Sequence, residues 1–327
     1  MRKVTLKDIA NKLGVTIGTV SHVLNGIDDI SEETKNKVLK AAREMGYISN
    51  SAAVSLRSGK THTVAVIVPD ISNPYIAHQV KSIEMEMRKF NYSVFILNTN
   101  EDEETEYEAI VSACSKQVDG IFLCPCQKST KNVEFLDKLQ IPYILICRYF
   151  NSYETDYIGV DDYKGGRLAG EYLINKGYKN IIYFGAYKYI CSSVDRFRGI
   201  KDIFKENEID IPDSRFIEIN PTCGDNGDII EETLRKTKDF DSIIAFSDFV
   251  AFEIRGKLKE LCSGVKLPVV SFDAVNTYFK FPFENISVGV VDNELSSQAV
   301  KAMLEKIDSG KCDCKKLIDV KLYEFNC

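Results

Sequence analysis

Histidine is scarce in this sequence of 327 residues, which contains only His22, His62 and His78. Histidine is the most common general acid–base group in enzymes, and no nucleophile accompanies these three residues in a pattern typical of catalysis. The sequence also has no G-x-x-x-x-G-K-[ST] loop and no G-x-G-x-x-G turn, which argues against nucleotide hydrolysis and dinucleotide binding. We therefore expect a protein that is not an enzyme and that uses no cofactor.

Long apolar stretches are absent as well. No stretch approaches the roughly 18 to 20 consecutive apolar residues that a membrane-spanning helix needs. Near the N-terminus, Arg2 and Lys3 are not followed by the apolar core of a secretory signal peptide. We expect a cytoplasmic protein, associated with the nucleoid if it binds DNA.

The ten cysteines form neither a disulfide framework nor a metal-binding pattern. Cys124 and Cys126 form a C-x-C pair, as do Cys312 and Cys314, but no second pair of cysteines or histidines accompanies them at a suitable spacing. We expect reduced thiols and no metal site, with a metal site as the less favoured alternative. The most exposed thiols are expected to be those of Cys312, Cys314 and Cys327.

Charge is unevenly distributed along the chain, whose formal net charge is −6. Residues 1–60 contain ten Lys/Arg and six Asp/Glu, a formal charge of +4, so the rest of the chain carries −10. A basic head on an acidic body is typical of a DNA-binding module whose body is repelled by DNA. The chain is also too long for one ordinary core. We expect a head over 1–48, a hinge and linker over 49–60, and a core over 61–327.

The head shows the pattern of a helix-turn-helix. Thr5 can cap a first helix, with Asp8 three residues later, and Gly14 ends that helix. Thr16 can cap a second helix, which Asn25-Gly26 closes. The apolar residues expected on the inner faces of the two helices are Leu6, Ile9, Ala10, Leu13, Val20, Val23 and Leu24.

Such a motif places its second helix in the major groove of duplex DNA. The outer residues near the start of that helix are the candidates for reading base edges: Ile17, Gly18, Ser21 and His22. His22 can donate to a guanine acceptor, and Ile17 can contact a thymine methyl group. The candidates for phosphate contacts, which set the register of the protein on DNA, are Thr5, Thr16, Thr19, Asn25 and Tyr47.

A third helix follows, capped by Ser31 and ended by Gly46, with Val38, Leu39 and Ala42 expected inside. The next helical segment, 51–56, is too short to be stable alone in water. Its candidates for minor-groove contacts are the capping residue Asn50, the small Ala53 and the apolar wedge Leu56. Ordinary packing of Leu56 on the core is the alternative.

From residue 63 onward, apolar strands alternate with amphipathic helices. Strands are expected over 64–68, 93–97, 121–123, 143–146, 157–160, 181–184, 216–219, 242–246, 269–272 and 286–290. Helices are expected over 75–90, from 103, and over 165–175, 194–206, 228–236, 248–262 and 294–307. This alternation is typical of parallel sheets covered by helices on both faces, in two Rossmann-like subdomains with a cleft between them.

Ligands of such sheets bind beyond the carboxyl ends of the strands. The residues there that we expect to bind a small effector are Asn73, Tyr75, Arg148, Asp161, Arg196, Ser247 and Asp273. Carboxylates, arginine and aromatic rings together suit a polyhydroxylated ligand such as a sugar. Capping of the following helix is the alternative role for the aspartates, favoured for Asp248 and Asp292 and equally weighted for Asp161. The acidic run 101–108 is interpreted as a solvated helix start.

Residues 4–60 resemble the DNA-binding head of the lac-repressor (LacI/GalR-type) family of bacterial transcription regulators, and the resemblance continues over nearly all of the chain. The motifs V-T-L-K-D-I-A, G-V-T-x-x-T-V-S-x-V-L-N, S-E-E-T-K-x-K-V and G-Y-x-x-N-x-x-A-x-x-L are present in order. The resemblance implies a repressor that binds a palindromic double-stranded operator as a homodimer. It also implies a periplasmic-binding-protein-like core, with a small effector that changes operator affinity allosterically. Control by a protein co-repressor, or a sugar-binding module without DNA activity, are the alternatives.

The resemblance assigns the N-subdomain to about 61–160 and 292–320, and the C-subdomain to about 161–291 and 321–327. The arginine and aspartate that commonly hold the effector in this family match Arg196 and Asp273. His22 replaces a common arginine, Ser247 a frequent asparagine, and Val291 a polar residue. The identities of the operator and of the effector therefore cannot be transferred from the family. The sequence beyond residue 307 has no heptad repeat, so we expect no C-terminal coiled coil that would form a tetramer.

Overall fold

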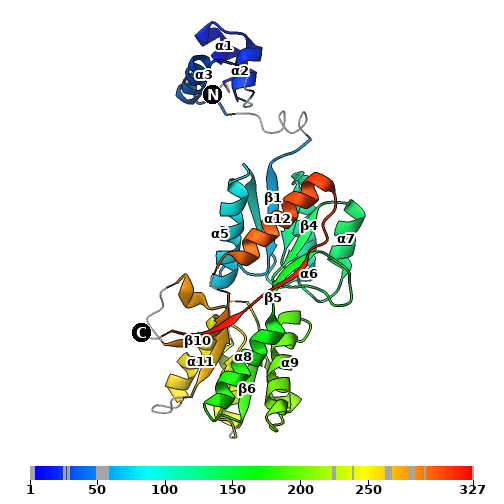
Figure 1. The fold of residues 1–327 in the computed structure, drawn as a ribbon, viewed down its shortest axis with the longest axis vertical. Coiled ribbons are helices and arrows are strands. Elements are labelled where there is room, and N and C mark those ends of the chain that lie inside the picture. Colours follow the sequence, from blue (N-terminus) through cyan, green and yellow to red (C-terminus); the bar gives the residue numbers. More distant parts are fainter. Residues whose placement is uncertain are drawn as a thin grey trace. The chain divides into compact units, whose positions relative to one another are not determined.

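The computed structural model describes residues 4–24, 27, 30–48, 59–222, 226–237, 239–261, 267–279, 284–290 and 292–325. The chain divides into two compact units, Met1–Thr61 and His62–Cys327 (Figure 1). The predicted phosphate contact Asn25 and the predicted hinge residues Asn50, Ala53 and Leu56 lie outside the described residues. None of the helices in the described ranges is long and apolar enough to cross a membrane.

The described part of the first unit contains three helices, α1 (Leu6–Leu13), α2 (Ile17–Leu24) and α3 (Glu32–Met45). Thr5 and Asp8 form a reciprocal capping box at the start of α1, and Gly14 ends it in the left-handed conformation. The Ser31 side chain accepts a hydrogen bond from the Thr34 amide at the start of α3, and Gly46 ends that helix. The predicted starts and ends of these helices are confirmed at each of these positions.

Seven buried residues form the head core: Ile9, Ala10, Val20, Val23, Val38, Ala41 and Ala42. The expected inward orientation of Leu39 is wrong, because its side chain is 40% exposed. Ala41 occupies the inner position instead, since a helix that buries Val38 next buries residues three and four positions later.

The described part of the second unit contains two sheets whose strands are mostly parallel. The first of these sheets has the strand order β11-β5-β4-β3-β1-β2. Its strands are β1 (Thr63–Val68), β2 (Ser93–Asn98), β3 (Gly120–Leu123), β4 (Tyr143–Ile146), β5 (Tyr157–Val160) and β11 (Lys315–Ile318). One face packs on α5 (Pro74–Arg88) and α12 (Glu294–Ser309). The other packs on α6 (Glu103–Ser115) and α7 (Lys131–Leu139).

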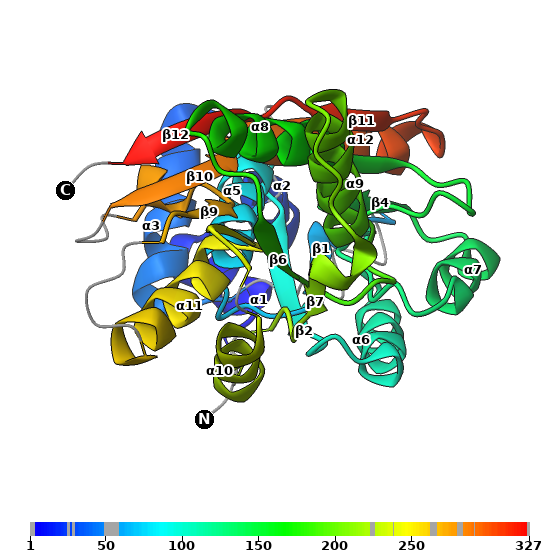
Figure 2. The ribbon, with the colours of Figure 1, turned by 90° about the horizontal axis from the view of Figure 1, so that it is seen from below.

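The second sheet has the order β12-β10-β9-β8-β6-β7, and only the β10–β12 pair is antiparallel. Its strands are β6 (Ile181–Gly185), β7 (Phe216–Glu218), β8 (Ser242–Ala245), β9 (Val269–Phe272), β10 (Asn285–Gly289) and β12 (Lys321–Phe325). One face packs on α8 (Asp162–Asn175) and α9 (Cys191–Glu206). The other packs on α10 (Gly227–Lys236) and α11 (Asp248–Leu261), so the helices cover both faces (Figure 2). Short 3-10 turns lie at Asp213–Arg215 and Val275–Thr277.

The chain passes between the two sheets three times. It crosses after β5, again between β10 and α12, and last between β11 and β12, where the red ribbon of Figure 1 passes from one sheet to the other. The Asp161 amide donates to the Ile318 carbonyl at 2.9 Å, and Gly289 pairs with Lys321, so the three crossings lie side by side. The sequence pattern does not predict α7, β11 or β12. Each of the two strands begins with lysine and lies partly exposed at a sheet edge, where apolar alternation is weak.

Close contact between α8 and α9 depends on two glycines. A Cβ atom on Gly166 would lie 2.0 Å from the Arg196 carbonyl oxygen, and one on Gly199 would lie 2.1 Å from the Tyr163 carbonyl oxygen. Each contact is between backbones, so no side chain can move aside to relieve it. Any residue larger than glycine at these two positions would therefore keep α8 and α9 further apart. The two helices carry Asp162 and Arg196 to the edge of the sheet.

Gly199→Ala is expected to lower the free energy of unfolding by about 1–3 kcal/mol, because the added methyl group forces α8 and α9 apart. The matched control is Gly256→Ala in α11, where a Cβ atom meets nothing within 4 Å. That change should raise stability by up to about 1 kcal/mol, since alanine favours an exposed helix interior. Urea unfolding of the full chain measures both, and equal effects of the two substitutions would contradict the close-contact argument.

Candidate DNA-reading helix and ligand cleft

The four candidate base-reading residues lie on the outer side of α2. Gly18, His22 and Ile17, the last of them 47% exposed, face away from the head core, and Ser21 is half-buried. Val20 and Val23 on the opposite side are buried. The helical period that hides the two valines therefore leaves a small, mixed apolar and polar surface at the start of α2.

The candidate phosphate contacts also have local structural roles. The Thr16 hydroxyl accepts a hydrogen bond from the Thr19 amide at 3.0 Å and lies 2.9 Å from the Thr19 hydroxyl. Thr5 donates to the Asp8 carboxylate at 2.7 Å, and the half-buried Tyr47 packs against the head core. These contacts keep the threonine hydroxyls at the N-terminal ends of α1 and α2, where backbone amides and the helix dipole favour an anion.

In the second unit, a cleft of about 560 Å³, partly open to solvent, lies at the carboxyl ends of strands from both sheets. Among its lining residues are five of the candidates for effector binding: Asn73, Tyr75, Arg148, Arg196 and Asp273. Asp161 lines an adjoining chamber that shares Tyr75, Arg196 and Asp273 with the cleft. Ser247 lines neither space, because its buried hydroxyl accepts a hydrogen bond from the Val250 amide at the start of α11.

Arg196 is held in place from several directions. Its Nε donates to Asp162 Oδ1 at 2.7 Å, and its Nη1 donates to the Phe246 carbonyl oxygen. The guanidinium lies 4.3 Å from the ring centroid of Phe272 and 4.9 Å from that of Phe246. Burial raises the pKa of Asp162, and the positive charge of Arg196 opposes that rise. Arg196 is thus a fixed, charge-paired group in the cleft wall.

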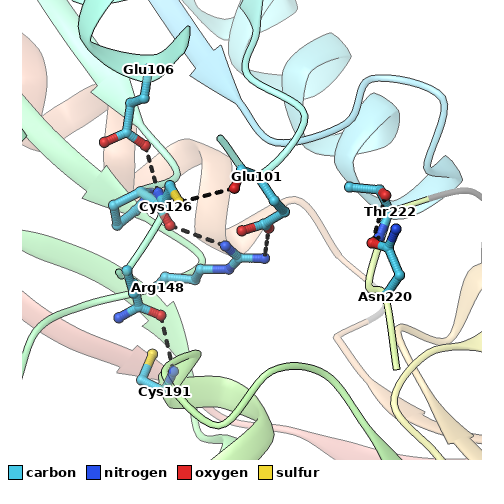
Figure 3. A network of polar contacts seen from close by, with 9 residues as sticks. Glu101, Glu106, Cys126, Arg148, Cys191, Asn220 and Thr222 are labelled. Atoms are coloured by element: carbon cyan, nitrogen blue, oxygen red, sulfur yellow. Dashed lines mark hydrogen bonds and ion pairs between the residues drawn. The ribbon is translucent and has the colours of Figure 1, made fainter. Parts of the chain in front are cut away.

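Arg148 is held in a similar way by Glu101, a residue that the sequence analysis treats as solvated. Arg148 Nη2 donates to Glu101 Oε1, and Nη1 donates to the Pro125 carbonyl oxygen at 3.0 Å. Figure 3 shows the Glu101 side chain pointing toward this guanidinium, with Glu106 and Cys126 in the same network. Glu101 lies just beyond the end of β2, so the rule applied to the other strand ends would have found it.

The interpretation of 101–108 as a fully solvated helix start is therefore wrong at two positions. Glu101 and Glu106 are 5% and 1% exposed. Glu106 accepts hydrogen bonds from the Cys126 amide and from Asn132 Nδ2, and burial raises its pKa to about 7. The other acidic residues of the run are exposed or half-buried, because they lie on the outer side of α6.

The capping interpretation of the aspartates is mixed in outcome. Asp161 accepts a hydrogen bond from the Lys164 amide and caps α8, and Asp292 accepts one from the Glu294 amide. Asp248 does not cap α11. Its buried carboxylate accepts from Ser271 Oγ, Asn285 Nδ2 and the Val275 amide, and so ties the ends of β9 and β10 to the start of α11.

Asp273 differs from these aspartates, because its carboxylate makes no hydrogen bond or ion pair with a described residue. It is 9% exposed, and its backbone has a positive φ of 99°. Burial raises its pKa to about 7, against the opposing charge of Arg196. Burial likewise raises the pKa of the Tyr75 hydroxyl, which lies near Asp273 and Asp162.

Polar contacts join the two subdomains beside the cleft. Gln127 Nε2 donates to the Tyr149 carbonyl oxygen at 2.7 Å, and Gln127 Oε1 accepts from the Cys191 amide of α9 at 2.9 Å. The Tyr149 hydroxyl donates to Asp195 Oδ2 at 2.9 Å. On the other side, the His78 ring stacks on Tyr278 with centroids 4.0 Å apart. These contacts must change if the cleft opens.

The described cysteines are unpaired. Cys124 and Cys147 are buried in the cleft lining, and Cys312 and Cys314, expected to be exposed, are half-buried. Cys327 lies outside the described residues. Within the ranges that the structure describes, no group of three or more His, Cys, Asp or Glu side chains is placed to hold a metal ion.

The raised pKa of Asp273 predicts a pH-dependent effect of Asp273→Asn on stability. Between about pH 4 and pH 7 the folded protein keeps a proton that the unfolded chain has lost, so the stabilisation present at low pH is lost as pH rises through 7. Asparagine should therefore raise the free energy of unfolding by about 1–2 kcal/mol at pH 8, a few degrees in Tm, and by less at pH 5. Thermal unfolding of both proteins at both pH values tests this, and an effect that is independent of pH would contradict it.

Comparison with known proteins connects both sites to one family. Residues 5–50 match the model of bacterial regulatory proteins of the lacI family, and residues 61–309 match that of periplasmic binding proteins and the sugar binding domain of the LacI family. The chain is 30% identical over 259 residues to the HTH-type transcriptional regulator RegA of Clostridium saccharobutylicum, covering 78% of this chain and 77% of the relative. It is 28% identical to the ribose operon repressor of Halalkalibacterium halodurans, covering 98% and 94%.

A solved structure of the lac repressor dimer, bound to operator and the anti-inducer ONPF, has the same fold. Its TM-score is 0.82 at 19% identity, over 98% of each chain. The named relatives are transcription regulators and not enzymes. The helical head, the two α/β subdomains and the family matches that together span most of the chain lead to one conclusion: the protein is a DNA-binding transcriptional regulator of the LacI family.

Proposed function

We propose that this protein is a repressor whose operator affinity is controlled by a small polar ligand in the cleft. The observation that carries the proposal is that both subdomains contribute to the cleft wall. Asn73, Tyr75 and Arg148 follow strands of the first sheet, whereas Arg196 and Asp273 belong to the second subdomain. A ligand that contacts both sets of residues stabilises one relative placement of the subdomains over another.

The DNA-binding part of the proposal rests on α2. Its exposed surface of Ile17, Gly18 and His22 has the size and chemistry needed to meet base edges in a major groove. One such helix contacts only a few base pairs, so we propose a homodimer whose two heads read the halves of a palindromic operator. The acidic core favours this arrangement, because it keeps the rest of the chain away from DNA.

Transmission between the two sites is proposed to pass through segment 49–60, with Asn50, Ala53 and Leu56 entering the minor groove. The sequence supports this role, since so short a helical segment needs DNA or a partner subunit to be stable. A ligand changes DNA affinity only by as much as it prefers one arrangement of the protein over the other. The relation to the ribose operon repressor and similar regulators favours a sugar-sized ligand.

His22→Ala is expected to weaken specific binding by about 1–3 kcal/mol, because it removes one base-edge contact. The duplex for this test is selected from genomic fragments that the full-length protein binds, and affinity is measured by fluorescence anisotropy. Asn36→Ala, at an exposed position of α3, is the matched control and should leave affinity unchanged. Binding by the unchanged protein should also fall steeply with salt. An affinity that depends on neither His22 nor salt would contradict the assignment of the head.

Arg196→Lys should weaken or abolish the ligand response while leaving DNA affinity without ligand nearly unchanged. Lysine keeps a positive charge beside Asp162 but cannot make the contacts of the planar guanidinium. Arg198→Lys is the control on the same helix, because Arg198 is largely exposed and pairs only with Asp195 among the ion pairs described. The test compares operator affinity with and without a ligand that shifts the unchanged protein. An intact response in Arg196→Lys would place the ligand elsewhere.

A further inference from the structure

The cleft contains two positive charges, and both are already neutralised. Arg148 and Arg196 are the only basic side chains among the described residues that line the cleft and its adjoining chamber. Arg148 pairs with Glu101, and Arg196 pairs with Asp162. The remaining donors of both guanidiniums are directed in part to backbone carbonyls, those of Pro125 and Phe246. A bound anion would find no unpaired cation here.

Several carboxylate oxygens, by contrast, are left without hydrogen-bond donors among the described residues. Glu101 Oε2 and Asp162 Oδ2 are buried and accept no hydrogen bond, although the other oxygen of each carboxylate is paired. Asp273 makes no hydrogen bond or ion pair with its side chain among the described residues. All three side chains are more than nine-tenths buried, and each lines the cleft or the adjoining chamber. Buried acceptors of this kind are unfavourable unless a ligand or water supplies donors.

Aromatic rings line the same two spaces as these carboxylates. Tyr75 lines both spaces, and burial with the nearby negative charges of Asp273 and Asp162 contributes to the raised pKa of its hydroxyl. Phe246 lines the cleft, and Phe272 lines the chamber. The face of an aromatic ring attracts a cation, as the placement of the Arg196 guanidinium over Phe272 and Phe246 already illustrates.

We propose that the cleft binds a small polyhydroxylated ligand with a protonated amine, an amino sugar, and that it rejects phosphorylated and carboxylated sugars. The amine supplies up to three N–H donors and one positive charge to a site that has carboxylate acceptors and no unpaired cation. A phosphate would instead be desolvated among like charges, which is strongly unfavourable in a buried site. This inference rests on the proposed role of the cleft as the effector site.

A neutral sugar satisfies part of the same chemistry, because its hydroxyl groups also donate hydrogen bonds. It leaves the Asp273 carboxylate without a charge partner, however, because Glu101 and Asp162 are already paired with Arg148 and Arg196. The amine should therefore add affinity beyond that of the parent sugar, and most of this advantage should depend on Asp273, the carboxylate that lacks any partner in the described structure.

Stereochemically matched sets of sugars test the charge preference. D-Glucosamine, D-galactosamine and D-mannosamine are each compared by isothermal titration calorimetry with the parent hexose and its 6-phosphate, using the full-length protein. In at least one set the amino sugar should bind tenfold or more tightly than the hexose, and no 6-phosphate should bind detectably. The proposal is overturned if no amino sugar binds, or if a hexose or 6-phosphate matches the amino sugar in every set.

Variants then locate the origin of the preference. Asp273→Asn should reduce the amine-over-hexose ratio about tenfold, whereas Asp210→Asn, at an exposed position outside the cleft, should leave it unchanged. Glu101→Gln removes the partner of Arg148 and should permit binding of a 6-phosphate that the unchanged protein rejects. If Glu101→Gln does not fold, the ratio in Asp273→Asn decides alone, and an unaltered ratio there overturns the proposal.

Operator binding, measured in parallel by fluorescence anisotropy, separates this proposal from the proposed function. If a neutral or phosphorylated sugar shifts operator affinity and binds the cleft at least as tightly as the matching amino sugar, the proposed function holds and the charge preference fails. If an amino sugar binds with the expected dependence on Asp273 but leaves operator affinity unchanged, the charge preference holds and the regulatory role of the cleft fails.

Discussion

The pairing of Arg196 with Asp162 is the interaction on which the cleft depends. Breaking a buried ion pair by removal of one partner commonly costs about 3–5 kcal/mol, because the other charge stays buried without compensation. The pair joins the first residue of α8 to the first half of α9, and the two glycine contacts bring these helices close enough for it to form. The guanidinium then reaches Phe246 beyond β8 and Phe272 at the end of β9. Packing, charge pairing and the proposed ligand site therefore share one group of atoms.

The first subdomain has an equivalent arrangement around Arg148 and Glu101. Each subdomain, or lobe, thus presents to the cleft an arginine that is already paired with a carboxylate of the same subdomain. Such pre-organised groups lose little conformational entropy when a ligand binds, and they offer defined acceptors and ring faces in place of mobile charges. Contacts across the cleft margin, such as Gln127 with Cys191 and Tyr149 with Asp195, join the two subdomains in this structure.

Local patterns in the sequence predict most of the fold. Caps such as Thr5 and Ser31, the terminating Gly14 and Gly46, and continuous apolar runs such as 143–146 and 157–160 fix helices and strands through short-range physics. The edge strands β11 and β12 are not predicted, because edge strands have little apolar alternation and are stabilised by neighbours distant in the sequence.

The candidate site is predicted less completely, for a related reason. Positions beyond strand ends identify Arg148, Arg196 and Asp273, but the state of each depends on partners far along the chain. Glu101 in an acidic run gives no local sign of the arginine 47 residues away that draws it inward. Asp248 gives none of the serine and asparagine that turn it from a helix cap into a buried tie. Burial of charge is a tertiary property, and a pattern of neighbours does not contain it.

The three crossings between the sheets restrict the movement of the lobes. A single connection would let one lobe twist, slide and tilt against the other, whereas three strands of chain abreast, joined by the Asp161–Ile318 and Gly289–Lys321 pairings, resist twisting and sliding. Tilting about the line of the crossings is the motion that they restrict least. A molecule that contacts both walls of the cleft therefore acts mainly on one variable, the angle between the two sheets.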